Sequence, residues 1–301
     1  MKRREFITLV GGAATWPLAA QGQQRERVWR LGVLMNLASD DAEGQARLAA
    51  FHQGLQQLGW TVGRNVQIDY RWGAGDLDRI RKFAAELIAL APDVILAGGS
   101  PSVAALQQAT RTVPIVFVSV VDPVSSGFVD SLARPGGNIT GFAVFDYSIG
   151  GKWLELLKEM APRVTRAAVI RDPVLTTGGG QLGAIQALAP SVRVEVIPVN
   201  VRDGAEIERA IMAFGQSPNG GLIVVGSSLA AVHRDLIITL AAQHKLPAVY
   251  FARYFVVGGG LISYGPRFVD QYRDAAATSI GSSRARGRLR CRCKQRPSTI
   301  W

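Results

Sequence analysis

The chain has 301 residues, of which 48% are hydrophobic and 19% charged, as expected for a folded protein long enough for two α/β domains. Of the net charge of +11, residues 281–301 contribute +7 and residues 1–24 contribute +2, which leaves +2 for residues 25–280. A body with so little charge excludes nucleic acid as its expected partner. Both cysteines, Cys291 and Cys293, lie in the basic end, so the body offers no thiol for a disulfide.

The first 24 residues have the pattern of an export signal. Arg3 and Arg4 stand in a basic start, and the stretch over residues 8–20 is uncharged and largely apolar. Paired arginines at this place resemble a twin-arginine signal, which serves proteins exported in the folded state. The apolar stretch is shorter than the roughly 20 residues that a membrane-spanning helix needs, so an uncleaved anchor is the weaker alternative. We therefore expect a periplasmic protein.

The first half of the body alternates strand and helix patterns. Residues 94–97 and 115–121 are continuous apolar, β-branched runs, which suit parallel strands covered on both faces. The predicted strands are 31–35, 65–72, 94–97 and 115–121, and the predicted helices are 42–58, 76–91 and 102–110. This series predicts a doubly wound parallel sheet with right-handed crossovers.

The second half repeats this pattern after a turn cluster at 134–138. Its predicted helices are 152–160, a helix that ends at 188, 203–214 and 232–244, and its predicted strands are 167–170, 194–199, 222–225 and 248–251. We interpret the run 253–264 as a return to the first domain. The expected organisation is lobe 1 over 25–138, lobe 2 over 139–252 and a return to lobe 1 over 253–280, with a hinge and a ligand cleft between the lobes.

Five motifs in the body resemble a known family. They are Ala97-Gly-Gly-Ser-Pro101, Pro114-Ile-Val-Phe-Val118 followed by Asp122-Pro-Val124, Leu132-Ala-Arg-Pro-Gly-Gly-Asn-Ile-Thr-Gly-Phe142, Lys152-Trp-Leu-Glu-Leu-Leu-Lys158 and Gly259-Gly-Leu-Ile-Ser-Tyr-Gly265. Together they resemble ABC transporter substrate-binding proteins of the tryptophan/phenylalanine-binding type. The resemblance implies a type I periplasmic-binding-protein fold. It also implies a monomer that is not an enzyme, uses no cofactor, captures a small solute such as an amino acid, and delivers it to an ABC permease in the inner membrane.

Candidate ligand-binding residues follow the predicted strands, because ligands bind at the carboxyl edge of an open α/β sheet. Ser100 and Ser102 could donate to a ligand carboxylate or only cap their helix. Asp122 could hold a ligand ammonium or be a turn residue before proline. The other candidates, each with a structural alternative, are Asp172, Ser227 and Ser228 in lobe 2, Phe145 and Asp146 after the first crossing, and Tyr254, which could stack on a ligand or pack in the core.

Two other functions are weaker alternatives. An NAD-type Rossmann enzyme would need a G-x-G-x-x-G turn, and Gly98-Gly-Ser-Pro101 lacks that spacing. A ligand-sensing regulator of the same fold would need an N-terminal helix-turn-helix where the export signal stands. A metal site at Cys291 and Cys293 lacks further ligands nearby.

Residues 281–301 depart from the family pattern. One codon choice for Ile280-Gly-Ser-Ser-Arg-Ala-Arg286, read in a shifted frame, gives Asp-Arg-Ile-Leu-Lys-Gly-Glu, which the family carries at this place. We therefore hypothesise an out-of-frame end that is basic and disordered, lacks the final crossing between the lobes and leaves the C-terminal part of the fold incomplete. A basic arm for nucleic acid or anionic lipid is the alternative. Resequencing the gene tests the hypothesis, and an intact frame contradicts it.

Overall fold

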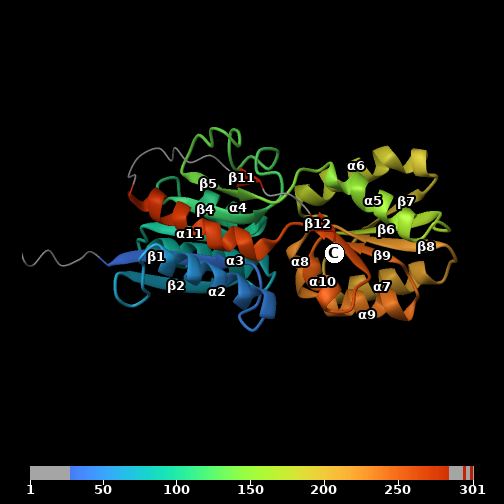
Figure 1. Ribbon diagram of the computed structural model, residues 1–301, viewed down its shortest axis with the longest axis horizontal. Coiled ribbons are helices and arrows are strands. Elements are labelled where there is room, and N and C mark those ends of the chain that lie inside the picture. Colours follow the sequence, from blue (N-terminus) through green and yellow to red (C-terminus); the bar gives the residue numbers. More distant parts are fainter. Residues whose placement is uncertain (1–27, 285–293, 296–298, 301) are drawn as a thin grey trace, which may run out of the picture.

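Two α/β lobes lie side by side along the long axis of the molecule (Figure 1). This computed structural model describes residues 28–284, 294–295 and 299–300, so the predicted export signal lies outside the described residues. Each lobe is built on one sheet. No helix within the described residues is long and apolar enough to cross a membrane.

The first lobe has the strand order β11-β5-β4-β3-β1-β2, with every pairing parallel. Its strands are β1 (Trp29–Met35), β2 (Val66–Trp72), β3 (Val94–Gly98), β4 (Ile115–Val120), β5 (Ile139–Ala143) and the two-residue β11 (Lys294–Gln295). Its helices are α2 (Ala42–Gln57), α3 (Leu77–Ala89), α4 (Ser100–Ala109) and, after the second lobe, α11 (Phe268–Arg284).

Strand periodicity divides the core of this lobe between the two faces of the sheet. Leu96 of β3 packs in a cluster with residues of α2 and α11, whereas its neighbours Ile95 and Ala97 pack with residues of α3 and α4. Successive side chains of a strand point to opposite faces, so a continuous apolar run needs a helical cover on both sides. The predicted α/β fold with doubly wound sheets is therefore confirmed for this lobe.

The second lobe repeats this topology with the order β12-β10-β9-β8-β6-β7. Its strands are β6 (Arg166–Arg171), β7 (Glu195–Asn200), β8 (Gly220–Val224), β9 (Ala248–Tyr250), β10 (Ile262–Gly265) and the two-residue β12 (Thr299–Ile300). Its helices are α5 (Ile149–Met160), α6 (Thr176–Val192), α7 (Gly204–Gly215), α8 (Ser228–Val232), α9 (Arg234–Gln243) and α10 (Arg253–Val257). All its strand pairings are parallel except that of β12 with β10.

Both predicted lobe boundaries need correction. The strand at 139–143 pairs with β4 and completes the first sheet, so the chain leaves lobe 1 after residue 143 rather than after 138. The segment 253–265 stays in lobe 2, because β10 pairs with β9. The predicted extended run from 253 begins instead as helix α10, in which Phe255 stacks on Tyr250 with ring centroids 4.7 Å apart. Strand pairing joins residues far apart in sequence, so local patterns do not identify the sheet that a strand joins.

Gln271 of α11 links the segment in which the chain leaves lobe 1 to the helix with which it returns there. This fully buried side chain donates from Nε2 to the Ala143 carbonyl oxygen over 3.1 Å and accepts at Oε1 from the Ser119 amide over 2.9 Å. It therefore links the returning helix to the end of β5, where the chain first leaves the lobe.

The predicted disordered tail is also corrected in part. Helix α11 continues to Arg284, β11 pairs with β5 in lobe 1, and β12 pairs with β10 in lobe 2 (Figure 1). Since β11 and β12 belong to different sheets, the end of the chain makes a third crossing, which we expected to be missing. Residues 285–293, 296–298 and 301, which include both cysteines, lie outside the described residues.

Candidate functional site

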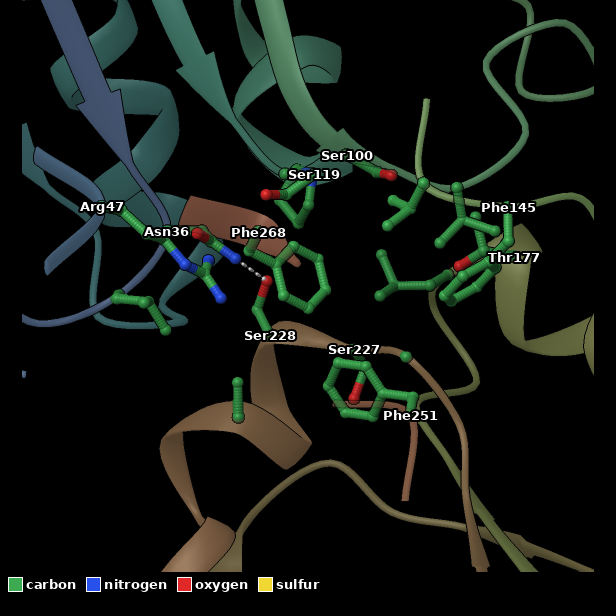
Figure 2. Close-up of a pocket in the computed structure, with 18 of the residues that line it drawn as sticks. Asn36, Arg47, Ser100, Ser119, Phe145, Thr177, Ser227, Ser228, Phe251 and Phe268 are labelled. Atoms are coloured by element: carbon green, nitrogen blue, oxygen red, sulfur yellow. Dashed lines mark hydrogen bonds between the residues drawn. The ribbon is translucent and has the colours of Figure 1, made fainter. Parts of the chain in front are cut away.

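A pocket lies between the two lobes at the carboxyl ends of their strands (Figure 2). Counted to the atom surfaces and including the part open to solvent, it measures about 530 Å³. Its walls come from the ends of β1, β3 and β4, the crossing after β5, and the starts of α6 and α8.

The lobe 1 wall is polar. Asn36 follows β1, is 7% exposed and donates from Nδ2 to Ser228 Oγ across the pocket over 2.7 Å, whereas its Oδ1 has no partner among the described residues. Ser100 opens α4 directly after Gly99, whose φ of +85° turns the chain from β3 into the helix. Ser119 reaches the pocket at a break in the β4–β5 register, where a φ of +60° redirects its side chain.

The lobe 2 wall begins at the turn between β8 and α8. Ser227 is the N-cap of α8, and its side chain accepts from the Ala230 amide over 3.0 Å. The next residue, Ser228, is 8% exposed and receives the hydrogen bond from Asn36. Thr177 in the first turn of α6 adds a buried hydroxyl group. Polar groups of both lobes therefore face the same space.

Aromatic rings form the rest of the lining. Phe251 lies edge-on to Tyr254 at 5.9 Å and to Phe268 at 6.5 Å between ring centroids, so three of the rings form a continuous surface. Phe145, in the first crossing, packs edge-on against Trp153 at 5.6 Å. This surface favours an apolar or aromatic part of a ligand.

Arg47 of α2 is the one charged residue among the described pocket-lining residues. It is 3% exposed, its Nε lies 2.9 Å from Glu43 Oε1, and its guanidinium carbon lies 4.5 Å from the centre of the Phe268 ring. Burial lowers the pKa of Arg47, but the charge interactions with Glu43, Tyr272 and Tyr254 and the hydrogen bond to Glu43 together outweigh burial and hold this pKa above its usual range. Burial raises the pKa of Tyr254, so the pocket keeps a permanent cation beside neutral rings.

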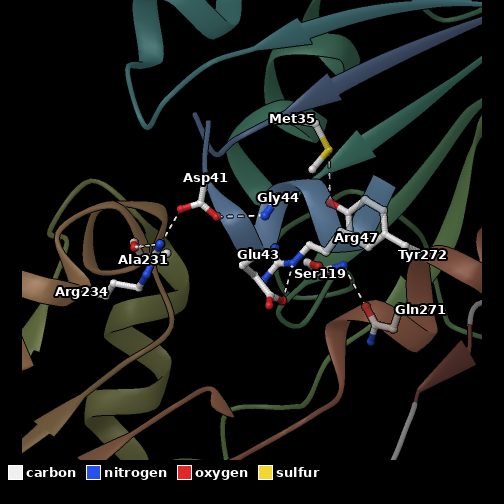
Figure 3. A network of polar contacts seen from close by, with 10 residues as sticks. All are labelled: Met35, Asp41, Glu43, Gly44, Arg47, Ser119, Ala231, Arg234, Gln271 and Tyr272. Atoms are coloured by element: carbon white, nitrogen blue, oxygen red, sulfur yellow. Dashed lines mark hydrogen bonds and ion pairs between the residues drawn. The ribbon is translucent and has the colours of Figure 1, made fainter. Parts of the chain in front are cut away.

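The lobes also touch beside the pocket (Figure 3). Arg234 of α9 forms an ion pair with Asp41, and it donates to the Ala231 carbonyl oxygen over 3.1 Å. Asp41 also caps α2 by accepting from the Gly44 amide over 2.9 Å. With the Asn36–Ser228 hydrogen bond, this ion pair holds the lobes in a closed arrangement.

Five of the predicted site residues line the pocket: Ser100, Phe145, Ser227, Ser228 and Tyr254. The structure does not place the other predicted residues there. Ser102 is fully buried in α4. Three carboxylates accept hydrogen bonds from the backbone of their own turns: Asp122 from the Ser125 amide over 3.0 Å, Asp146 from the Ser148 amide over 2.9 Å, and Asp172 from the Val174 amide over 2.9 Å. The contacts of these three carboxylates are therefore those of turn residues rather than of ligand-binding groups.

Several lining residues escaped prediction: Asn36, Arg47, Ser119, Thr177, Phe251 and Phe268. The rule that selected Ser100, a polar side chain in the turn after a predicted strand, would also have selected Asn36. Arg47 carries another signal, because a cation four residues before Phe51 lies on the apolar face of a predicted helix. In the part of the chain that the structure describes, no group of three or more His, Cys, Asp or Glu side chains could hold a metal ion.

Comparisons with known proteins agree with this geometry. Residues 34–279 match the family model described as ABC transporter substrate binding protein. A tyrosine-binding protein of Clostridioides difficile (strain R20291) is 27% identical over 215 residues, which are 71% of this chain and 61% of that protein, so the chain spans less than two thirds of this relative.

Two solved structures share the fold. An ABC domain from Streptococcus pneumonia in complex with L-Trp is 20% identical, with 90% of each chain covered and a TM-score of 0.82. The ligand-free, open structure of a substrate-binding protein with adhesive properties from Clostridium difficile is 23% identical, with 91% of each chain covered and a TM-score of 0.64.

Proposed function

Because the chain belongs to the family of ABC transporter substrate-binding proteins, we propose that its interlobe pocket captures an aromatic or branched amino acid and presents it to an ABC permease. The observation that carries the proposal is a closed pocket in which buried polar groups and Arg47 face a surface of aromatic rings. The relatives that bind tyrosine and L-Trp support this ligand class.

Closure of the lobes is the expected mechanism of capture. The Asn36–Ser228 hydrogen bond and the Asp41–Arg234 ion pair each join one lobe to the other, so both break when the cleft opens. A solute held between the two walls adds contacts that exist only in the closed state. Ligand binding therefore shifts the population toward closure.

Proteins of this family typically work outside the cytoplasm, and we propose that this chain reaches the periplasm through its twin-arginine pattern and acts there as a monomer. We also propose that it binds its solute without chemical change. The family match supports neither the NAD-type enzyme nor the regulator as an alternative.

A ligand screen by thermal shift tests the proposal. L-phenylalanine, L-tyrosine, L-tryptophan and L-leucine are added to the exported protein, with NADH as the probe for the enzyme alternative. A ligand at 100 times its dissociation constant stabilises the folded state by about 2.7 kcal/mol, which is a measurable rise in the melting temperature. A protein that is folded by circular dichroism but responds to none of the amino acids contradicts the proposal. A response to NADH alone favours the enzyme.

A further inference from the structure

We infer that the pocket selects its ligand by the carboxylate, through Arg47, and sets no counter-charge against an amino group, so that aromatic carboxylic acids without an amino group are ligands as well. The inference rests on the proposed function and names the ligand class of the same pocket. Its basis is the distribution of charge around the closed cleft.

No Asp or Glu stands among the described residues that line the pocket. The nearby acids have partners elsewhere, because Asp41 pairs with Arg234 and Asp122 accepts from the backbone and hydroxyl of Ser125. An ammonium group that enters the closed cleft thus meets only neutral acceptors, such as the unpartnered oxygens of Asn36 and Ser119. Burial of an ammonium without a carboxylate is costly, and neutral hydrogen bonds offset that cost only in part.

A carboxylate that enters the pocket, in contrast, finds a positively charged partner. The Arg47 guanidinium has five N–H donors, and the Nε donor is directed to Glu43. The guanidinium carbon lies 4.5 Å from the centre of the Phe268 ring and 5.8 Å from that of the Tyr254 ring, and both rings line the pocket. A carboxylate beside these rings can accept from the terminal N–H groups of Arg47.

Glu43 pairs with Arg47 but does not itself line the pocket. Its side chain lies at the wall of a neighbouring groove, together with Arg234, Arg253 and Arg267. Arg234 and Arg267 are themselves paired, with Asp41 and Asp270. Among the described residues that line the pocket, Arg47 is thus the charged group that a ligand meets, and it favours an anionic group over a cationic one.

The shape of the pocket assigns the other end of the ligand. Figure 2 shows Arg47 at one end and Phe145 with Thr177 at the other, with Phe251 and Phe268 between them. A ligand with a carboxylate at Arg47 thus places its side chain along the aromatic rings. Arylpropionates and aromatic 2-oxo acids have this form.

Calorimetric titration of the exported protein with three probes tests the inference. L-phenylalanine is the reference, 3-phenylpropionate lacks the amino group, and 2-phenylethylamine lacks the carboxylate. We expect 3-phenylpropionate to bind within about tenfold of L-phenylalanine, and 2-phenylethylamine to lose about 10- to 100-fold relative to 3-phenylpropionate, which is the range of one charged hydrogen-bonded pair.

Binding of L-phenylalanine with no binding of 3-phenylpropionate overturns the inference and leaves the proposed function intact. Binding of 3-phenylpropionate without any of the amino acids supports the inference and overturns the amino-acid proposal. Equal binding of 2-phenylethylamine and 3-phenylpropionate overturns the inference, and failure of all three probes, with the amino-acid screen also negative, overturns both.

Variants of Arg47 separate recognition from packing. Arg47→Gln should reduce the preference for L-phenylalanine over its carboxamide to about twofold or less, whereas Arg47→Lys should retain a reduced preference. A residue that only packs would lower both affinities equally and leave the preference unchanged, which contradicts the inference. Arg209→Gln, at an exposed side chain of α7, is the control and should behave as the wild type. The probe series on the wild-type protein decides the question even if Arg47→Gln fails to fold.

Discussion

At the scale of single residues, Gly99 sets the geometry of the lobe 1 wall. Its backbone, with φ of +85° and ψ of 159°, lies in a region that residues with a side chain rarely adopt. A Cβ atom added there would lie 2.9 Å from Asn36 Nδ2, the atom that reaches Ser228 across the pocket. The turn into α4 and the cross-lobe hydrogen bond therefore depend on the same glycine.

We predict that Gly99→Ala lowers the free energy of unfolding by about 1–3 kcal/mol, because alanine is strained in this conformation. It should also weaken ligand binding, since Asn36 must move away from Ser228. Gly137→Ala is the matched control, because a Cβ atom there meets nothing within 4 Å. Urea denaturation and calorimetric titration provide the two measurements. Equal unfolding free energies for both variants would show that Gly99 is not required.

At the scale of elements, two-residue strands extend each sheet by one position. β11 adds to the β5 edge of lobe 1 and β12 adds to the β10 edge of lobe 2. An uncovered edge strand exposes unpaired backbone groups, and β5 is buried at every position. β11 and β12, which belong to the basic end of the chain, therefore contribute to both sheets, whether or not that end arose from a frameshift.

We predict that a chain ending at Arg284 melts about 2–4 °C below one ending at Ile300, which corresponds to the loss of about 1 kcal/mol in a protein of this size. The longer variant keeps β11 and β12 and lacks only Trp301, so it is the control. Differential scanning calorimetry measures the difference. Identical melting temperatures would mean that these strand pairs contribute nothing to stability.

At the scale of the whole molecule, the closed arrangement depends on contacts that join the lobes. The side chains of Asp41 and Arg234 are 9% and 19% exposed, so solvent screens their ion pair less than one on the surface. Asp41 also caps α2, and asparagine is as good an N-cap as aspartate. Asp41→Asn therefore removes the charge and leaves the helix start in place.

We predict that Asp41→Asn and Arg234→Gln each weaken ligand binding by about two- to tenfold, mainly through faster dissociation. The double variant should be little worse than either single one, because both remove the same interaction. Stopped-flow fluorescence measures the dissociation rate. The exposed pair Asp78 and Arg81 supplies the control, since Asp78→Asn should leave the rate unchanged. Additive effects in the double variant would contradict a direct coupling across the cleft.

Local patterns in the sequence determine the two doubly wound sheets and part of the site. Continuous apolar strands require cover on both faces, and a hydroxyl group in the turn after such a strand lies at the ligand edge, as those of Ser100 and Ser227 do. The same local signal also selected Asp122 and Asp172. Their carboxylates instead accept hydrogen bonds from backbone amides of their own turns. The sequence pattern does not show whether such a carboxylate binds its own turn or a ligand.

Only the tertiary structure decided the rest. Arg47 lies within a helix and Phe268 at the start of the returning one, and each reaches the pocket because α2 and α11 pack together on one face of the first sheet. The sheets that β5 and β10 join, and the pairing of β11 and β12 with them, likewise depend on contacts between distant segments. Propensity and periodicity act over a few residues, whereas the cleft is formed by residues that lie far apart along the chain.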